Sequence, residues 1–189
     1  MFDPNADLFF ESPRINRTPP ADYGVLHLLR RDICLCLGWD PVTQTQTNHQ
    51  TLWPGGMAIL AGIDLVAKYL KGDDTTGRVG QRFKDYIAKY FQPLSASDGE
   101  TIYQLRNALL HSFGLYSQTK TKTYYFALTA NKSTLVQSLG QDIRQIDLRT
   151  LHEKFEDSLR KYASDLNTDA TLQSNFQKMF VNYGAIHFG

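Results

Sequence analysis

Hydrophobic and polar positions alternate along this chain mostly with the period of an α-helix. In six segments apolar residues recur every three or four positions, which places them on one helical face. The segment over 53–71 is apolar on most sides, so we expect it at the centre of the fold. The sequence predicts a mostly α protein, a bundle of four to six helices. The segments cover 21–37, 53–71, 78–91, 99–113, 148–166 and 171–183.

Several residues mark where these helices begin and end. Pro20 and Asp22 suit a first turn, so the first helix is expected to open near residue 21. Ser95, Ser97 and Asp98 are candidate caps for the fourth helix, and Gly114 is its expected stop. Residues 40–52 are polar and rich in Thr and Gln, which predicts a loop.

After the fourth helix the pattern changes from helical to extended. Residues 121–129 are rich in β-branched and aromatic side chains, and Asn131 marks a turn. Residues 133–139 and 142–147 have the length of two further short strands. We therefore expect a small β-hairpin or three-stranded meander, inserted near 121–147 between two helical halves.

The domain organisation follows from length and proline content. Residues 1–20 hold four prolines, which predicts an irregular N-terminal arm that lies over the domain through Leu8, Phe9 and Phe10. A chain of 189 residues suits one domain with a short appendage. Residues 21–189 are therefore expected to form a single helical domain with the β insertion inside it.

Composition and charge narrow the possible partners. The formal net charge is +1, so no global field of one sign draws polyanions to the protein. Cys34 and Cys36 are too close for an easy disulfide and are expected on a core helix, which favours a reducing cytoplasm. The longest apolar stretch, 57–63, is far below the ~20 residues of a membrane span, so no membrane partner is expected.

Polar residues interrupt the apolar face of the fourth helix. Asn107 and His111 are four residues apart and share one face, whereas Arg106 lies about 140° from His111 on an ideal helix. We expect two antiparallel copies of this helix to be needed before an Arg106 head meets a His111 head. Asp64, inside the apolar second helix, needs a partner and either orients Arg106 or makes another structural hydrogen bond.

The segment L-R-N-A-L-L-H-S-F-G-L over 105–115 resembles the motif of the HEPN domain (higher eukaryotes and prokaryotes nucleotide-binding). That motif is an Arg, then a polar residue, then a His after four to six intervening positions, matched here by Arg106, Asn107 and His111. The resemblance covers about residues 20–166 and implies a HEPN-like helical bundle. It also implies a homodimer in which both motifs face one cleft, and metal-independent RNA cleavage with no cofactor.

RNA cleavage is chemically coherent with these residue types. RNA supplies its own nucleophile, the 2′-hydroxyl, so no metal-bound water is required. His111 is expected to move the proton, Arg106 to hold phosphate and Asn107 to support both. The products would be a 2′,3′-cyclic phosphate and a 5′-hydroxyl end, and DNA would not be cut. Defence or stress response under a regulatory protein partner is the expected setting.

Neighbouring residues are assigned supporting roles. Lys120, Lys122 and Tyr103 are expected to contact single-stranded RNA, while Asp64 and Glu100 are expected to support Arg106. Three tyrosines after the motif either stack on unpaired bases or pack within strands, namely Tyr116, Tyr124 and Tyr125.

Two alternatives to a nuclease stay open. Some HEPN domains have lost catalysis and bind RNA or nucleotides, so the resemblance is also compatible with a non-catalytic binding module. Some catalytic members carry Tyr two positions after the His, where this chain has Phe113. The second alternative is a structural protein that only dimerises, with Arg106 paired to Asp64 or Glu100.

Overall fold

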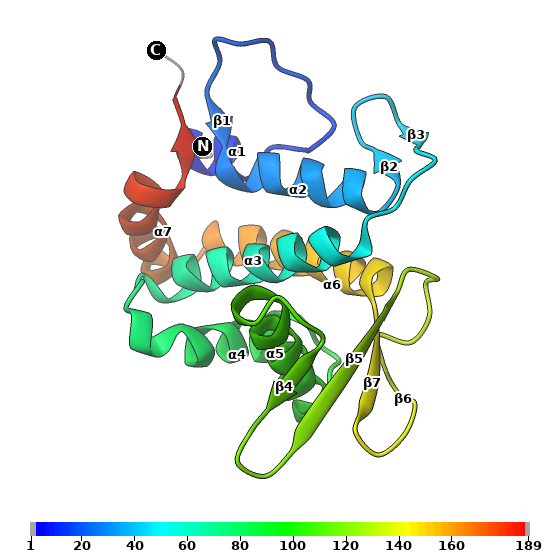
Figure 1. The fold of residues 1–189 in the computed structure, drawn as a ribbon. Coiled ribbons are helices and arrows are strands. Elements are labelled where there is room, and N and C mark those ends of the chain that lie inside the picture. The colour runs from blue at the N-terminus through cyan, green and yellow to red at the C-terminus, as the bar shows by residue number, and fades with distance from the viewer. Residues whose placement is uncertain (1–2, 188–189) are drawn as a thin grey trace.

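The computed structural model describes residues 3–187, and seven α-helices lie within them (Figure 1). The mostly α prediction is confirmed, and all six predicted helices are present, five of them with shifted ends and 148–166 with the predicted bounds. The first two residues of the expected arm and the last two of the expected domain lie outside the described residues. The helices are α1 (Pro4–Phe10), α2 (Val25–Cys36), α3 (Leu52–Lys71), α4 (Val79–Tyr90), α5 (Ala96–His111), α6 (Leu148–Leu166) and α7 (Ala170–Tyr183), and a 3-10 turn, Thr76–Arg78, precedes α4.

Helix α3 forms the centre of the fold, as its apolar composition predicts. Ile59, Leu60 and Ile63 are fully buried, and α3 contacts α2, α4, α5, α6 and α7. In Figure 1, α2 and α4 lie on opposite sides of α3. A Cβ on Gly62 would lie 2.7 Å from the Phe155 ring, so only glycine permits this approach of α6. Neither α3 nor any other described helix is long and apolar enough to cross a membrane.

The β insertion is a four-stranded sheet rather than the predicted hairpin or meander. Its strands are β4 (Tyr116–Gln118), β5 (Thr123–Thr129), β6 (Val136–Ser138) and β7 (Ile143–Asp147), in the order β4-β5-β7-β6. β5 and β7 are parallel, so the connection carries β6 to the outer edge.

The buried Asp147 stabilises the segments on either side of β6 and β7. Its Oδ2 accepts hydrogen bonds from the backbone N–H groups of Asn131 and Ser133, at 2.8 and 3.2 Å. Its Oδ1 caps α6 by accepting from the Thr150 N–H at 2.9 Å. One carboxylate therefore ties the turn after β5 to the start of α6, a long-range contact that strand propensity does not reveal.

The N-terminal arm is not irregular throughout, because residues 4–10 form helix α1. Asp3 accepts a hydrogen bond from the Asn5 N–H at 2.9 Å, and Pro4 occupies the first turn, where proline needs no donor. Phe9 is fully buried, with its ring centroid 4.4 Å from that of Tyr69 and 5.4 Å from that of Phe176. The arm covers the domain as expected, but it does so as part of the core.

Two short strand pairs also differ from the predictions. β1 (Tyr23–Gly24) pairs with β8 (Ala185–Ile186), so α2 begins at Val25 rather than near residue 21. This pairing joins the strand before α2 to the last strand of the described chain (Figure 1). β2 (Trp39–Asp40) pairs with β3 (Thr45–Gln46) inside the segment predicted to be a loop.

The two cysteines are free and lie on α2, as the sequence predicts. Cys34 is buried, and burial raises the pKa of its thiol to about 11. The thiol therefore stays protonated at neutral pH and behaves as a small core side chain.

An ion pair between α2 and α6 makes the fold sensitive to acid. Arg30 Nε and Nη2 contact the two Glu156 carboxylate oxygens at 2.9 and 2.6 Å. Burial acts to raise the pKa of Glu156, but interactions with His152 and Arg30 outweigh it and lower this pKa to about 2. Folding therefore favours the ionised carboxylate.

We expect Glu156 to contribute about 3 kcal/mol to the free energy of unfolding at neutral pH. Because its pKa is lower in the folded state, this contribution is present above the ordinary Glu pKa of 4.5 and is lost as pH falls toward 2. Urea unfolding at pH 7, 4 and 3 measures the loss, and Glu156→Gln should show a shallower dependence on pH. Identical pH dependence in both proteins would contradict this role.

Candidate functional site

Helix α5 carries the motif, whose first residue, Arg106, is buried and whose last residue, His111, is exposed. Ser95 caps the helix by accepting from the Asp98 N–H at 3.0 Å, which confirms the predicted cap. Leu105 and Leu109 are fully buried and fix the face that packs in the core. His111 is the last residue of the helix and is exposed to solvent.

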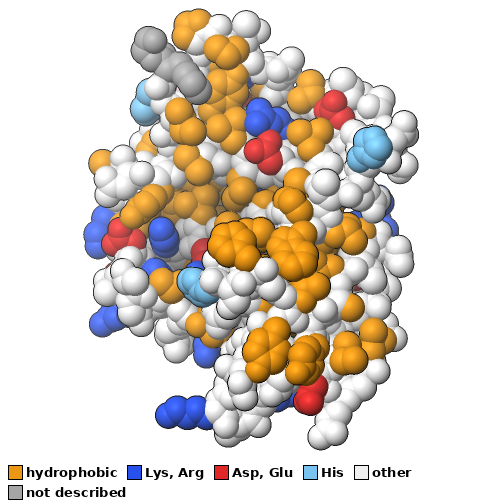
Figure 2. Space-filling model, in the orientation of Figure 1, with side chains coloured by type: hydrophobic (Ala, Val, Ile, Leu, Met, Phe, Trp, Pro, Cys, Tyr) orange, Lys and Arg blue, Asp and Glu red, His pale blue; other side chains and the backbone are white. Residues whose placement is uncertain are grey.

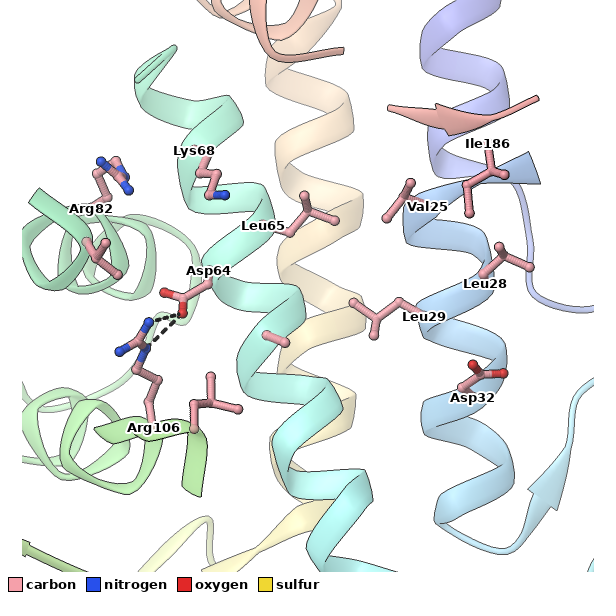
Figure 3. A pocket seen from close by; sticks show the side chains of 13 residues that line it. Val25, Leu28, Leu29, Asp32, Asp64, Leu65, Lys68, Arg82, Arg106 and Ile186 are labelled. Carbon is pink, nitrogen blue, oxygen red and sulfur yellow. Dashed lines mark hydrogen bonds and ion pairs between the residues drawn. The ribbon is translucent and has the colours of Figure 1, made fainter. Parts of the chain in front are cut away.

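Arg106 is a buried cation held by Asp64 of α3. Only 7% of Arg106 is exposed, and its Nε and Nη2 contact Asp64 Oδ2 at 2.8 and 2.6 Å (Figure 3). This partly buried carboxylate thus has the partner that its position requires. Burial raises the pKa of Asp64, and the Arg106 guanidinium opposes this shift.

The heads of Arg106 and His111 meet within a single chain, so the expected need for a second helix was wrong. Arg106 Nη1 contacts His111 Nε2 and lies 3.3 Å from Asn107 Oδ1. The 140° separation is the angle between the points at which the two side chains leave the helix. The arginine side chain is long enough to extend from its position to His111 at the end of the helix. A guanidinium only donates, so His111 Nε2 is the acceptor in this contact.

A groove of about 590 Å³ lies beside this cluster, between α2, α3, α4 and α5, with β8 at one end. This volume is within the range of small-molecule sites. Its walls include Val25, Leu29 and Leu65, and Figure 3 shows Lys68 and Arg106 on the side opposite the apolar residues of α2. Lys68 and Arg82 are cations that the sequence analysis did not assign to the site. The spacing of Asp64 and Lys68, four residues apart on an apolar helix, was the available signal.

Glu100 and Tyr103 do not join Arg106. Glu100 Oε1 instead accepts from Gln104 Nε2 at 2.7 Å, and Lys84 Nζ lies 3.6 Å from Glu100 Oε2. The Tyr103 ring packs against Phe83 of α4, with centroids 5.7 Å apart. Both residues are on α5, but their side chains contact residues of α4 rather than the Arg106–His111 pair.

Lys120 and Lys122 also lie away from the motif, although they follow it in sequence. Both lysines are in the turn between β4 and β5. On β4, Ser117 Oγ donates to Gln104 Oε1 of α5 at 2.6 Å, which places the strand beside the helix. β4 therefore runs back along α5, and its far end points away from His111. Lys122 Nζ lies 4.8 Å from the centroid of the Tyr124 ring.

The end of α5 has an unusual conformation at Phe113. Gly114 is the expected stop, but the left-handed residue is Phe113, with φ of 46°. A left-handed non-glycine residue costs about 1–2 kcal/mol. The Gly114 N–H donates to the Ala108 carbonyl at 3.0 Å, and the Phe113 side chain is 71% exposed. An exposed aromatic in a strained conformation therefore lies two residues after His111.

Neither metal-ligand clustering nor similarity identifies the site. Among residues 3–187, no group of three or more His, Cys, Asp or Glu side chains is placed to hold a metal ion. No protein-family model, no curated protein and no solved structure matches the chain.

Proposed function

We propose that this chain is a metal-independent endoribonuclease with a HEPN-like bundle, and that it acts as a homodimer on single-stranded RNA. One observation supports this most strongly. An exposed histidine, His111, contacts a buried arginine, Arg106, which a partly buried carboxylate, Asp64, holds in place. A positioned cation next to a reachable imidazole is the pair that attack of a 2′-hydroxyl on phosphorus needs.

In the proposed reaction the phosphate replaces the resting contact between Arg106 and His111. A phosphate oxygen accepts the Arg106 Nη1–H, which frees His111 Nε2. Nε2 then takes the proton of the 2′-hydroxyl, and the 2′-oxygen attacks phosphorus. The bond to the 5′-oxygen breaks, leaving a 2′,3′-cyclic phosphate and, after protonation, a 5′-hydroxyl end.

The homodimer supplies the second proton transfer in this scheme. The His111 that accepts the proton of the 2′-hydroxyl cannot donate a proton to the 5′-oxygen in the same step. The His111 of a second copy, protonated at the start, would donate to the 5′-oxygen. The half-exposed apolar walls of the groove beside the motif, such as Leu28 and Leu110, favour contact with another protein surface at this face.

A non-catalytic RNA- or nucleotide-binding module is the second candidate. It is favoured by the Asp64–Arg106 pair, because the carboxylate already neutralises the guanidinium. Most Arg106 N–H groups are directed at Asp64, Asn107 and His111, so few remain for phosphate. Defence or stress response, a regulatory protein partner and action in the cytoplasm remain parts of the proposal.

Incubation with single-stranded RNA in EDTA tests the proposal. We expect the full chain to cut RNA and to leave 2′,3′-cyclic phosphate ends, which mass spectrometry of the fragments identifies. A DNA oligonucleotide of the same sequence should stay intact because it lacks the 2′-hydroxyl. RNA that binds without being cut would support the binding module instead, and RNA that neither binds nor is cut would contradict both.

A further inference from the structure

A row of exposed apolar side chains crosses the whole sheet. Tyr116 faces Tyr125 across β4 and β5, and Tyr125 faces Ile143 across β5 and β7. The Leu139 N–H donates to the Ile143 carbonyl at 3.1 Å, which brings Leu139 to the end of the row. Each of the four is 43–51% exposed, and Figure 2 shows hydrophobic side chains side by side over the sheet.

The aromatic end of this row leads to the motif. Phe113 is 71% exposed and lies between His111 and Tyr116 in the chain. The Tyr116 and Tyr125 ring centroids are 5.3 Å apart. Tyr124 and Phe126 point to the other face and are buried, so the core does not require an aromatic side chain at Tyr125. We call Phe113, Tyr116 and Tyr125 the aromatic path.

The charge around the path favours a polyanion, even though the net charge of the chain is +1. Residues 101–141 contain no Asp or Glu, but they contain three lysines, besides the Arg106 that Asp64 neutralises. One of these lysines, Lys132, pairs with Glu153 at 2.6 Å. Lys120 is exposed at the turn of the hairpin that carries Tyr116 and Tyr125. Two carboxylates border this stretch in sequence, Glu100 before it and Asp142 after it.

The polar neighbours of the path suit the edges of nucleic acid bases. Gln118, Thr123 and Gln145 share the outer face of the sheet with Tyr125, by the alternation of residues along each strand. Amide and hydroxyl groups both donate and accept hydrogen bonds. Aromatic rings on a strand surface are a common platform on which unpaired bases stack.

We propose that the aromatic path binds single-stranded RNA by base stacking and directs the strand toward His111. Lys120 contacts its phosphates at the far end of the hairpin. The direction of the strand rests on the proposed function, whereas the stacking itself does not. In this proposal the exposed Tyr116 and Tyr125 position the RNA, whereas the buried Tyr124 packs in the protein core.

Binding of a fluorescent single-stranded RNA to the full-length His111→Ala protein tests the path without cleavage. We expect Tyr125→Ala in this background to weaken binding about tenfold, and Phe113→Ala to weaken it to a similar extent. Tyr125→Phe keeps the ring and should keep the affinity. Val181→Ala removes a side chain that is 83% exposed on α7, away from the sheet, and is the matched control.

Each outcome decides between stacking and its competitors. Unchanged RNA affinity in a folded Tyr125→Ala protein would overturn the path. A Tyr125→Ala protein that changes from dimer to monomer in sedimentation, with the same RNA affinity, would make this face a contact between copies and would also overturn it. Tyr125-dependent binding by a wild-type chain that cuts no RNA would uphold the path and reject the nuclease. RNA cleavage and binding that are unchanged in Tyr125→Ala would reject the path and uphold the nuclease.

Discussion

Replacement of His111 by alanine is expected to lower the rate of RNA cleavage about 10²- to 10⁴-fold, the usual contribution of a general base. His111 is exposed at the end of α5, so its loss leaves the core of the bundle intact. Arg106 stays anchored by Asp64, and RNA binding should therefore persist. The measurement is the initial rate of fragment formation in EDTA, with thermal unfolding as the check on folding.

The matched control is His49→Ala, which removes another exposed histidine, in the segment between β3 and α3. That variant should cut RNA at the wild-type rate. Added imidazole should restore part of the activity of His111→Ala, because a small base can enter the space that the exposed ring leaves. Equal rates for wild type and His111→Ala would show that the cutting activity is not centred on this histidine.

The helices could be predicted from sequence because their determinants are local. The apolar period of α3 and the serine cap of α5 operate within one or two turns, and both appear where expected. Helix α1 was not predicted for a local reason as well, since the four prolines of residues 1–20 indicate an irregular chain. At the first position of a helix, proline is instead well suited. The burial of Phe9 then stabilises so short a helix.

The sheet topology and the contacts of the Arg106 side chain could not be predicted, because they involve residues far apart in the sequence. The parallel pairing of β5 with β7 ends at Asp147, whose carboxylate accepts from backbone N–H groups 14 and 16 positions earlier in the chain. Arg106 meets Asp64 across 42 residues, and the sequence left the partner of Asp64 open. Helical angles alone could not show that a long side chain reaches His111, because they fix only the position of its Cβ.

The pair of Asp64 and Arg106 predicts the largest effect on stability. We expect Asp64→Ala to lower the free energy of unfolding by about 3–5 kcal/mol, because it leaves the buried Arg106 charge unpaired. Asp85→Ala is the surface control, since the pair of Lys71 and Asp85 at 2.7 Å is substantially exposed. Exposed pairs contribute at most about 1 kcal/mol. Urea unfolding of the three proteins at pH 7 measures both effects.

The double variant Asp64→Leu with Arg106→Met separates a missing charge partner from lost packing. With both charges removed, no buried cation remains, so we expect most of the stability to return, as for other ion pairs replaced by apolar side chains. The double variant should nevertheless cut no RNA, since it lacks the phosphate contact. A loss from Asp64→Ala no larger than that from Asp85→Ala would mean that Arg106 finds water in place of Asp64. Arg106 would then be free to move toward solvent, and its hold on His111 would not depend on α3.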